Sequence, residues 1–291
     1  MIGAILKTAR PYHWLKNPIV FAALIFARKY NDLSAIEKSI GAFIVFCLAA
    51  SAVYFINDIT DRAKDRLHPL KKLRPIASGK LSPGVAGAVT VILLALALVL
   101  GYELGRNFML LVIAYVVLNF AYSLGLKNLV ILDVMSVAMG FVLRAAAGAV
   151  AISVPISSWL LICTILLALF LGFAKRRHEL VLMGSEAISH RQSLAHYSPY
   201  FLDQMIGVVT ASTVVAYTFY TLSPEIREKF GTGDLVMTVP IVLYGIFRYL
   251  YLVHQKEEGG NPTKLLITDG PLLICVALWI ITVLAILQFG V

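Results

Sequence analysis

The chain has 291 residues, of which 59% are hydrophobic and only 14% are charged. A soluble domain is near half apolar and about one quarter charged, so this composition, with a mean hydropathy of +0.84, excludes an ordinary soluble protein. The apolar residues form continuous blocks of ~20 residues, long enough to cross a hydrocarbon core of ~30 Å as helix. Continuous blocks also exclude a transmembrane β-barrel, whose strands alternate apolar and polar residues. The sequence therefore predicts an all-α membrane protein.

Nine apolar blocks follow one another along the chain, and we interpret each as a transmembrane helix, the first being the weakest. They cover residues 17–33, 36–56, 84–102, 107–125, 129–151, 155–174, 203–223, 235–253 and 271–290. An odd number of spans places the two termini on opposite sides of the membrane. We predict one transmembrane domain over residues 1–291, with long polar segments at 57–80 and 175–200, after the second and sixth spans.

Lysine and arginine residues are distributed unevenly between the two sides that these spans define. The side of the N-terminus collects 17 of them and the other side 6, while the remaining two of 25, Arg144 and Arg248, fall within spans. Cytoplasmic loops are the ones enriched in Lys and Arg. The split predicts a multi-pass protein of the cell membrane whose N-terminus and segments 57–80 and 175–200 are cytoplasmic.

The formal net charge of +9 leaves two explanations open. It reflects the positive-inside bias, or it attracts an anionic substrate, and both can hold together. The basic residues lie in loops beside a bilayer, so we expect no nucleic-acid partner. Cys47, Cys163 and Cys275 lie in separate apolar blocks without metal-ligand spacing, and we expect neither a metal site nor a disulfide from them.

The most informative stretch covers residues 57–66, directly below the second predicted span. At about 100° per residue on a helix, Asp61, Asp65 and Asp58 fall near 40°, 80° and 100° from Asn57, within one third of the circumference. Three carboxylates on one face repel one another, whereas Mg²⁺ prefers oxygen ligands. We predict that these four residues hold Mg²⁺, with the three aspartates in the catalytic role. The alternative is a solvated helix of mixed charge, because basic residues interleave with the acids.

A basic loop follows at residues 68–80, where proline and glycine interrupt the helix. Its cations can neutralise phosphate groups beside a metal ion. They can equally form a patch for lipid headgroups, and the residues alone leave both open.

These motifs resemble the signature of the UbiA superfamily of intramembrane prenyltransferases. The resemblance lies in Asn57-Asp58-x-x-Asp61-x-x-x-Asp65, in Arg74-Pro75-Ile76-Ala77-Ser78-Gly79 and in Tyr122-Ser123-x-x-x-Lys127. It extends over essentially the whole chain. It implies a fold of nine helices around a lipid-open cavity, with the first Asp-rich motif binding a diphosphate through Mg²⁺ at the mouth of that cavity.

The second polar segment departs from the pattern of this superfamily. Enzymes that prenylate aromatic rings carry a second Asp-rich motif there, whereas this chain has Lys175-Arg176-Arg177-His178-Glu179-Leu180, with Arg191 further on. One metal-binding group and one cationic group suit two different phosphates: a diphosphate leaving group and a phosphate held by Arg and Lys. Each of these three cations can also be only the positive-inside flank of the sixth span.

This combination resembles one branch of the superfamily, the decaprenyl-phosphate phosphoribosyltransferases. Arg10-Pro11-x-x-Trp14-x-Lys16-Asn17 supports the resemblance, as does Asp133 with Phe141-Val142-Leu143-Arg144-Ala145. The branch implies phosphoribosyl pyrophosphate as the donor and a polyprenyl phosphate as the acceptor. The substrate-binding residues that we expect are Lys16, Asn17, Asn57, Arg62, Arg66, Arg74, Tyr122, Lys127, Arg144, Lys175, Arg176, Arg177, Glu179 and Arg191.

Arg144 lies near the middle of the predicted span 129–151, and Asp133 lies eleven residues earlier. Charges inside a membrane are costly, so we expect a functional role for Arg144. A structural ion pair with another helix is the alternative. Eleven residues cover ~16 Å of helix axis, so we do not expect these two residues to pair with each other.

The reaction that we predict transfers 5-phosphoribose to the lipid phosphate and releases pyrophosphate. The nearest alternative is a Mg²⁺-dependent prenyltransferase with a prenyl diphosphate donor and an aromatic or quinone-precursor acceptor, which would need a carboxylate pair in segment 175–200. A lipid-phosphate transporter would spread charges through the depth of several spans, and a non-catalytic lipid-binding protein would not need the aspartate register. The sequence leaves open the prenyl chain length and the oligomeric state, a homo-oligomer included.

Overall fold

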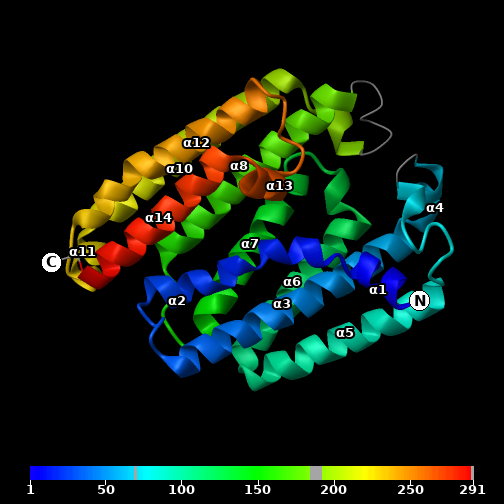
Figure 1. Cartoon of the computed structure of the whole chain (residues 1–291). Helices are drawn as coiled ribbons and strands as arrows, with labels where there is room; N and C mark the ends of the chain where they lie inside the picture. The colour runs from blue at the N-terminus through cyan, green and yellow to red at the C-terminus, as the bar shows by residue number, and fades with distance from the viewer. Residues whose placement is uncertain (69–70, 184–191, 290–291) are drawn as a thin grey trace. The chain divides into compact units, whose positions relative to one another are not determined.

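The computed structural model describes residues 1–68, 71–183 and 192–289, which contain helices and no strand (Figure 1). Eight helices in these residues are long and apolar enough to cross a membrane. They confirm the all-helical membrane fold. The contacts between residues divide the chain into two compact units, residues 1–126 with 140–156 and residues 127–139 with 157–291.

The first unit is built around one long helix, α3 (Leu33–Thr60), which Asp32 caps through a hydrogen bond from the Ala35 amide. The helices α1 (Ile2–Ala9), α5 (Pro83–Glu103) and α6 (Arg106–Leu124) pack against α3. The short helix α4 (Arg62–Leu67) continues below it. The C-terminal part of α7 (Leu132–Ala151) completes the unit. The rings of Phe46, Phe108 and Tyr115 meet edge to face in its core.

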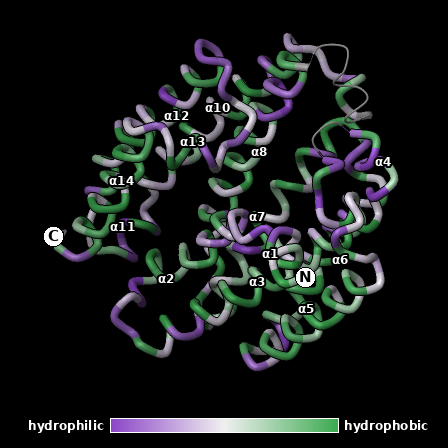
Figure 2. The backbone as a smooth tube through the Cα atoms, turned by 45° about the vertical axis from the view of Figure 1, so that its right-hand side comes forward, coloured by the Kyte–Doolittle hydropathy of each residue, from purple (hydrophilic) through white to green (hydrophobic). Residues whose placement is uncertain are grey.

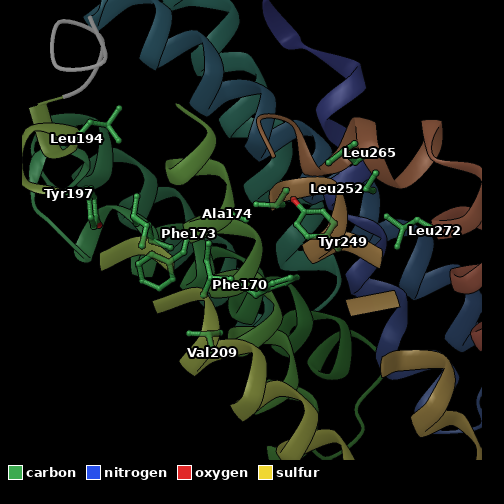
Figure 3. Packing of buried hydrophobic residues seen from close by; sticks show 14 residues of the cluster. Phe170, Phe173, Ala174, Leu194, Tyr197, Val209, Tyr249, Leu252, Leu265 and Leu272 are labelled. Carbon is green, nitrogen blue, oxygen red and sulfur yellow. The ribbon is translucent and has the colours of Figure 1, made fainter. Parts of the chain in front are cut away.

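The second unit contains the N-terminal part of α7 and four helices of membrane length or near it. These are α8 (Ser158–Met183), α10 (Pro199–Leu222), α12 (Val239–His254) and α14 (Gly270–Phe289). Shorter helices connect them: α11 (Pro224–Phe230) and α13 (Pro262–Thr268). In the core, the rings of Phe170 and Tyr249 lie 5.2 Å apart edge to face (Figure 3).

Apolar side chains also cover the outer surface of the long helices. Figure 2 shows hydrophobic residues along these helices and hydrophilic ones gathered at their ends and in the connecting segments. In α5, for example, Val91, Ile92 and Val99 are exposed. A bilayer solvates such side chains, so their exposure is expected of helices that span a membrane.

The first predicted span, residues 17–33, is wrong as a single helix. The chain forms three short pieces instead, namely η1 (Pro11–Lys16), η2 (Pro18–Phe21) and α2 (Ala22–Phe26). Proline removes a backbone donor and clashes with the preceding turn, and the prolines at positions 11 and 18 begin new pieces. The described residues therefore contain eight helices of membrane length rather than about nine.

These short pieces nevertheless run the length of α3 in the opposite direction. Trp14 donates to Ser51 at 3.1 Å, and Asn17 contacts the sulfur of Cys47 at 3.2 Å. Further on, the rings of Phe21 and Phe43 lie 5.6 Å apart. The segment thus packs along α3 without forming one continuous helix.

The sixth predicted span ends too early. We expected it to stop at residue 174, but α8 continues to Met183. The polar residues 175–179 therefore lie on a helix, which is consistent with the high helix propensity of Lys, Arg and Glu.

Candidate active site

The Asp-rich motif lies where α3 passes into α4. The helix breaks at Asp61, yet the Asp61 amide donates to the Asn57 carbonyl at 2.9 Å and the Asp65 amide donates to the Asp61 carbonyl at 2.8 Å. These bonds bridge the break, and Asp58 and Asp65 lie close enough to contact the same arginine, Arg74. Asp58 and Asp65 are buried, and Asp61 is half-buried.

Two arginines contact the buried carboxylates of this motif. Arg10 donates to Asp58 Oδ1 at 2.5 Å. Arg74 Nη1 donates to the same oxygen at 3.2 Å and to Asp65 Oδ2 at 2.7 Å. Two carboxylates from different helical turns thus converge on one cationic nitrogen. The side chains of the arginines remain 23% and 29% exposed, whereas those of the aspartates are at most 5% exposed.

Arg10 occupies an unusual backbone conformation. Its φ of 52° and ψ of 61° place it in the left-handed region, which residues other than glycine rarely adopt. Its guanidinium lies 4.8 Å from the centre of the Tyr54 ring, a cation–π distance. Ser51 donates to the Ala9 carbonyl at 3.1 Å and fixes the residue before it. The sequence placed Arg10 in a motif but assigned it no role, because only the fold brings it to Asp58.

The remaining predicted residues of this region divide into paired and unpaired groups. The hydroxyl of Ser123 bonds to the side-chain oxygen of Asn57, and the neighbouring Tyr122 is half-buried. Arg66 donates to the Ala77 carbonyl at 3.1 Å and so orders the basic loop. The Nε of Arg62 is buried and has no hydrogen-bond partner among the described residues.

The donor chemistry of this motif fits a divalent cation. Carboxylate and amide oxygens are the ligands that Mg²⁺ takes in proteins, and here a cationic nitrogen lies between two such carboxylates. In the described part of the chain, however, no three Asp, Glu, His or Cys side chains already converge as a metal-binding group. The assignment of Asn57, Asp58, Asp61 and Asp65 to Mg²⁺ stays a prediction.

Arg144 is buried in the first unit and bonds only to neutral acceptors in the hydrogen bonds that the structure defines. Its guanidinium donates to Asn17 Oδ1 at 2.8 Å, to the Gly140 carbonyl at 2.9 Å and to the Tyr115 hydroxyl at 2.8 Å. None of these three bonds goes to Asp133. Lys16, next to Asn17, is half-buried.

In the second unit, Asp133 is the centre of a buried network. It is 0% exposed and accepts from Arg176 Nε at 2.7 Å, from Ser193 at 3.2 Å and from the Tyr197 hydroxyl at 2.7 Å. The Tyr197 oxygen in turn accepts from the Ile131 amide at 2.7 Å. Burial raises the pKa of Tyr197 above its usual range, and the hydrogen bond to Asp133 raises it further. Tyr197 therefore stays a protonated donor at neutral pH.

The cations of segment 175–177 are paired with carboxylates. Arg176 donates to Glu179 at 2.8 Å in addition to Asp133, and Lys175 lies 3.8 Å from Glu179. Arg177 bonds to Asp203 at 2.5 Å. Asp203 lies just beyond the segment in which we looked for carboxylates, so the sequence did not connect it with Arg177. Lys127 is half-buried, and Arg191 lies outside the described residues.

Comparison with known proteins identifies the family. A sequence model of the UbiA prenyltransferase family matches residues 17–268. The chain belongs to the UbiA prenyltransferase family. This confirms the resemblance, and the chain is a transferase of that family.

The chain resembles both UbiA sequences that carry a functional name and solved UbiA structures. A protein of Mycolicibacterium smegmatis named decaprenyl-phosphate phosphoribosyltransferase is 32% identical and is matched over 100% of this chain and 94% of its own length. A protein of the same name from Corynebacterium glutamicum is 32% identical over 96% of this chain and 85% of its own length. A solved UbiA homologue from Archaeoglobus fulgidus, bound to GPP and Mg²⁺, is 19% identical and superposes with a TM-score of 0.74 over 98% of this chain and 99% of its own. The last likeness shows the fold alone.

Proposed function

We propose that this UbiA protein transfers 5-phosphoribose from phosphoribosyl pyrophosphate to a polyprenyl phosphate. The observation that carries the proposal is the 32% identity, over the whole chain, to a protein named decaprenyl-phosphate phosphoribosyltransferase. The chemistry of the first unit supports it, because buried carboxylates lie beside partly exposed arginines and the Nε of Arg62 has no partner among the described residues.

In the proposed reaction the bond from the anomeric carbon to the pyrophosphate oxygen breaks, and a bond to an oxygen of the lipid phosphate forms. Pyrophosphate leaves with the electron pair. The acceptor is ionised at neutral pH, so no residue has to remove a proton. Mg²⁺ held by Asp58, Asp61 and Asp65 would supply electrostatic stabilisation of the leaving group.

The protein's own residues would act by positioning and by charge. Arg10 and Arg74 have N–H donors beyond those that bond to the aspartates, and a guanidinium with five donors can bind carboxylate and phosphate together. The buried Nε of Arg62 is a further donor, and it has no acceptor among the described residues. Loss of such a donor should therefore weaken binding of the diphosphate.

The test is incubation of the purified protein with radiolabelled phosphoribosyl pyrophosphate and a polyprenyl phosphate, with and without Mg²⁺. We expect label to move into the lipid phase only when the metal is present. Transfer of a prenyl group from a prenyl diphosphate to an aromatic acid, without phosphoribosyl transfer, would overturn the proposal in favour of the alternative activity.

We further propose that the N-terminus and segments 57–80 and 175–200 face the cytoplasm. The 17-to-6 distribution of Lys and Arg supports this orientation. Single cysteines in place of Lys72 and Lys264, in a background without the three native cysteines, should react with an impermeant reagent only from the cytoplasmic side. Reaction of either from the outside would contradict the orientation.

A further inference from the structure

A groove of about 540 Å³ runs along the surface of the second unit between α10 and α12, which lie side by side in Figure 1. None of its lining residues is among those that we assign to the transfer reaction. Its walls are apolar, and its polar residues Asp203 and His254 lie at one end. On α10 the lining reaches Val215, twelve residues further, which corresponds to about 18 Å of helix. One leaflet of a hydrocarbon core is about 15 Å thick, so the groove matches the reach of a lipid chain from one leaflet.

Gly207 forms part of the floor of this groove. A Cβ atom added there would meet no atom within 4 Å, and the position lies in a helix with ordinary backbone angles. A larger side chain at position 207 would occupy this space between α10 and α12. The glycine therefore leaves the groove open, although Gly is a poorer helix former than Ala.

A buried hydroxyl in the groove wall has no partner. Thr210 is 9% exposed and its Oγ1 makes no hydrogen bond among the described residues. Other threonines of α10 do bond to the carbonyl four residues earlier: Thr213 to Val209 at 2.7 Å and Thr218 to Val214 at 2.9 Å. Threonine populates two χ1 rotamers in a helix, so this hydroxyl has more than one orientation in which to donate to a ligand.

The polar end of the groove carries both signs of charge. Arg177 Nε bonds to Asp203 at 2.5 Å, and His254 Nδ1 lies 3.8 Å from the same carboxylate oxygen. Arg177 has further N–H donors, and the Asp203 side chain is 37% exposed. A headgroup with one phosphate and one amine would find an acceptor for its amine and donors for its phosphate at this end.

From these features we propose that the groove binds a glycerophospholipid of the surrounding leaflet, with a zwitterionic head bearing an amine. One acyl chain lies between α10 and α12, and the headgroup contacts Arg177 and Asp203. Thr210 lies seven residues below Asp203, about 10 Å along the helix, which is close to the inner limit of the interfacial layer. There its hydroxyl donates to the ester carbonyl at the head of the acyl chain. A polyprenyl phosphate has no acceptor at that depth, which favours the ester lipid as the occupant.

The first experiment measures lipid retention by native mass spectrometry of the purified full-length protein in detergent with dioleoyl phosphatidylethanolamine. The wild type should keep one lipid per chain. Gly207→Leu, which fills the groove without a clash, should lower retention at least about tenfold. Gly87→Leu is the matched control, because Gly87 also lies in a helix of membrane length with nothing within 4 Å of an added Cβ, but on α5. It should retain lipid like the wild type.

The second experiment tests the hydrogen bond of Thr210. Diester phosphatidylethanolamine should bind about two- to tenfold better than its diether analogue, the range expected for one hydrogen bond. In Thr210→Val the two lipids should bind equally. Equal binding of both lipids to the wild type would overturn the role of Thr210.

Three results would overturn the proposed occupant. Retention by Gly207→Leu at the level of the wild type would show that the lipid binds elsewhere. Displacement of phosphatidylethanolamine by a polyprenyl monophosphate, with the same dependence on Gly207, would assign the groove to the acceptor lipid. A dimer of the wild type that is lost in Gly207→Leu would assign it to a second copy of the chain. None of these results depends on the transferase reaction, because retention is measured without the donor.

Discussion

Each unit of the molecule contains a buried aspartate that bonds to arginine, but the two differ in how completely they are enclosed. Asp58 pairs with Arg10 and Arg74, whose side chains remain 23% and 29% exposed. Asp133 pairs with Arg176, which is 5% exposed. Both arrangements neutralise a carboxylate, yet only the first leaves its cations within reach of a ligand.

The difference suggests different roles for similar ion pairs. Charges that are fully enclosed depend on one another, and removal of one partner leaves an uncompensated charge that water cannot reach. Charges at a partly exposed site can exchange partners at a smaller cost, because water and ligands replace the lost contacts. We therefore interpret the Asp133 network as a structural connection between α7, α8 and the residues near Tyr197, and the Asp58 group as the one that rearranges during binding.

The largest effect on stability should come from Asp133→Ala. The change removes the acceptor of three hydrogen bonds within the described residues and takes the buried carboxylate away from Arg176, so we expect a loss of about 3–5 kcal/mol in the free energy of unfolding. Reversible unfolding in mixed micelles measures it. A loss below about 1 kcal/mol would show that the network does not hold the second unit together.

Asp58→Asn should instead affect catalysis. We expect phosphoribosyl transfer to fall at least about 100-fold, which is on the order of 3 kcal/mol of transition-state stabilisation, while the unfolding free energy changes less than in Asp133→Ala. Asp32→Asn is the matched control at the other end of α3, because Asn caps a helix as well as Asp does. Normal transfer by Asp58→Asn, or transfer that a chelator leaves unchanged, would contradict the metal site.

If the exposure of a cation determines its role, replacing Arg176 and replacing Lys175 should have different effects. Arg176→Ala should destabilise the protein by about 2 kcal/mol, because Asp133 loses its charged partner. Lys175, whose side chain is 43% exposed, should contribute little to stability. Lys175→Ala should instead raise the Michaelis constant for one of the two phosphorylated substrates roughly tenfold. Steady-state kinetics with each substrate varied in turn measures this. Unchanged Michaelis constants would mean that Lys175 only contributes to the positive-inside charge bias.

The sequence predicted the parts of the molecule that depend on local patterns. Continuous apolar blocks located eight of the helices, and Asp58 and Asp65, which the spacing placed on one face, both contact Arg74. The block at 17–33 failed because hydropathy does not register that Pro18 ends one piece and begins another.

The pairing of charges was beyond such patterns. Arg10 reaches Asp58 across 48 residues and Arg176 reaches Asp133 across 43, and neither distance corresponds to a helical repeat. Segment 175–200 looked mainly cationic, with Glu179 among three cations, because two further counter-charges, Asp133 and Asp203, lie outside it. Long-range packing decides which cations are enclosed, so the sequence could list the charged residues but could not separate structural ones from accessible ones.

The smallest effect concerns the phenol that completes the Asp133 network. Tyr197→Phe removes a donor to Asp133 and an acceptor for the Ile131 amide, and we expect a loss of about 1 kcal/mol at neutral pH. The folded protein raises the pKa of this phenol above its unfolded value, so the folded state favours the protonated form. Its contribution is therefore fully present below the unfolded pKa of about 10 and is lost as the pH rises further, toward the folded pKa.

Unfolding of the wild type and of Tyr197→Phe at a series of pH values measures this contribution. The difference between the two proteins should be constant from neutral pH to about 9 and should shrink in more alkaline solution. Ser193→Ala is the matched control, because it removes another donor to Asp133 that does not titrate. A difference that grows with alkaline pH would mean that Tyr197 is more easily ionised in the fold than in the unfolded chain, and the enclosed network would then not be the structural element that distinguishes the second unit from the first.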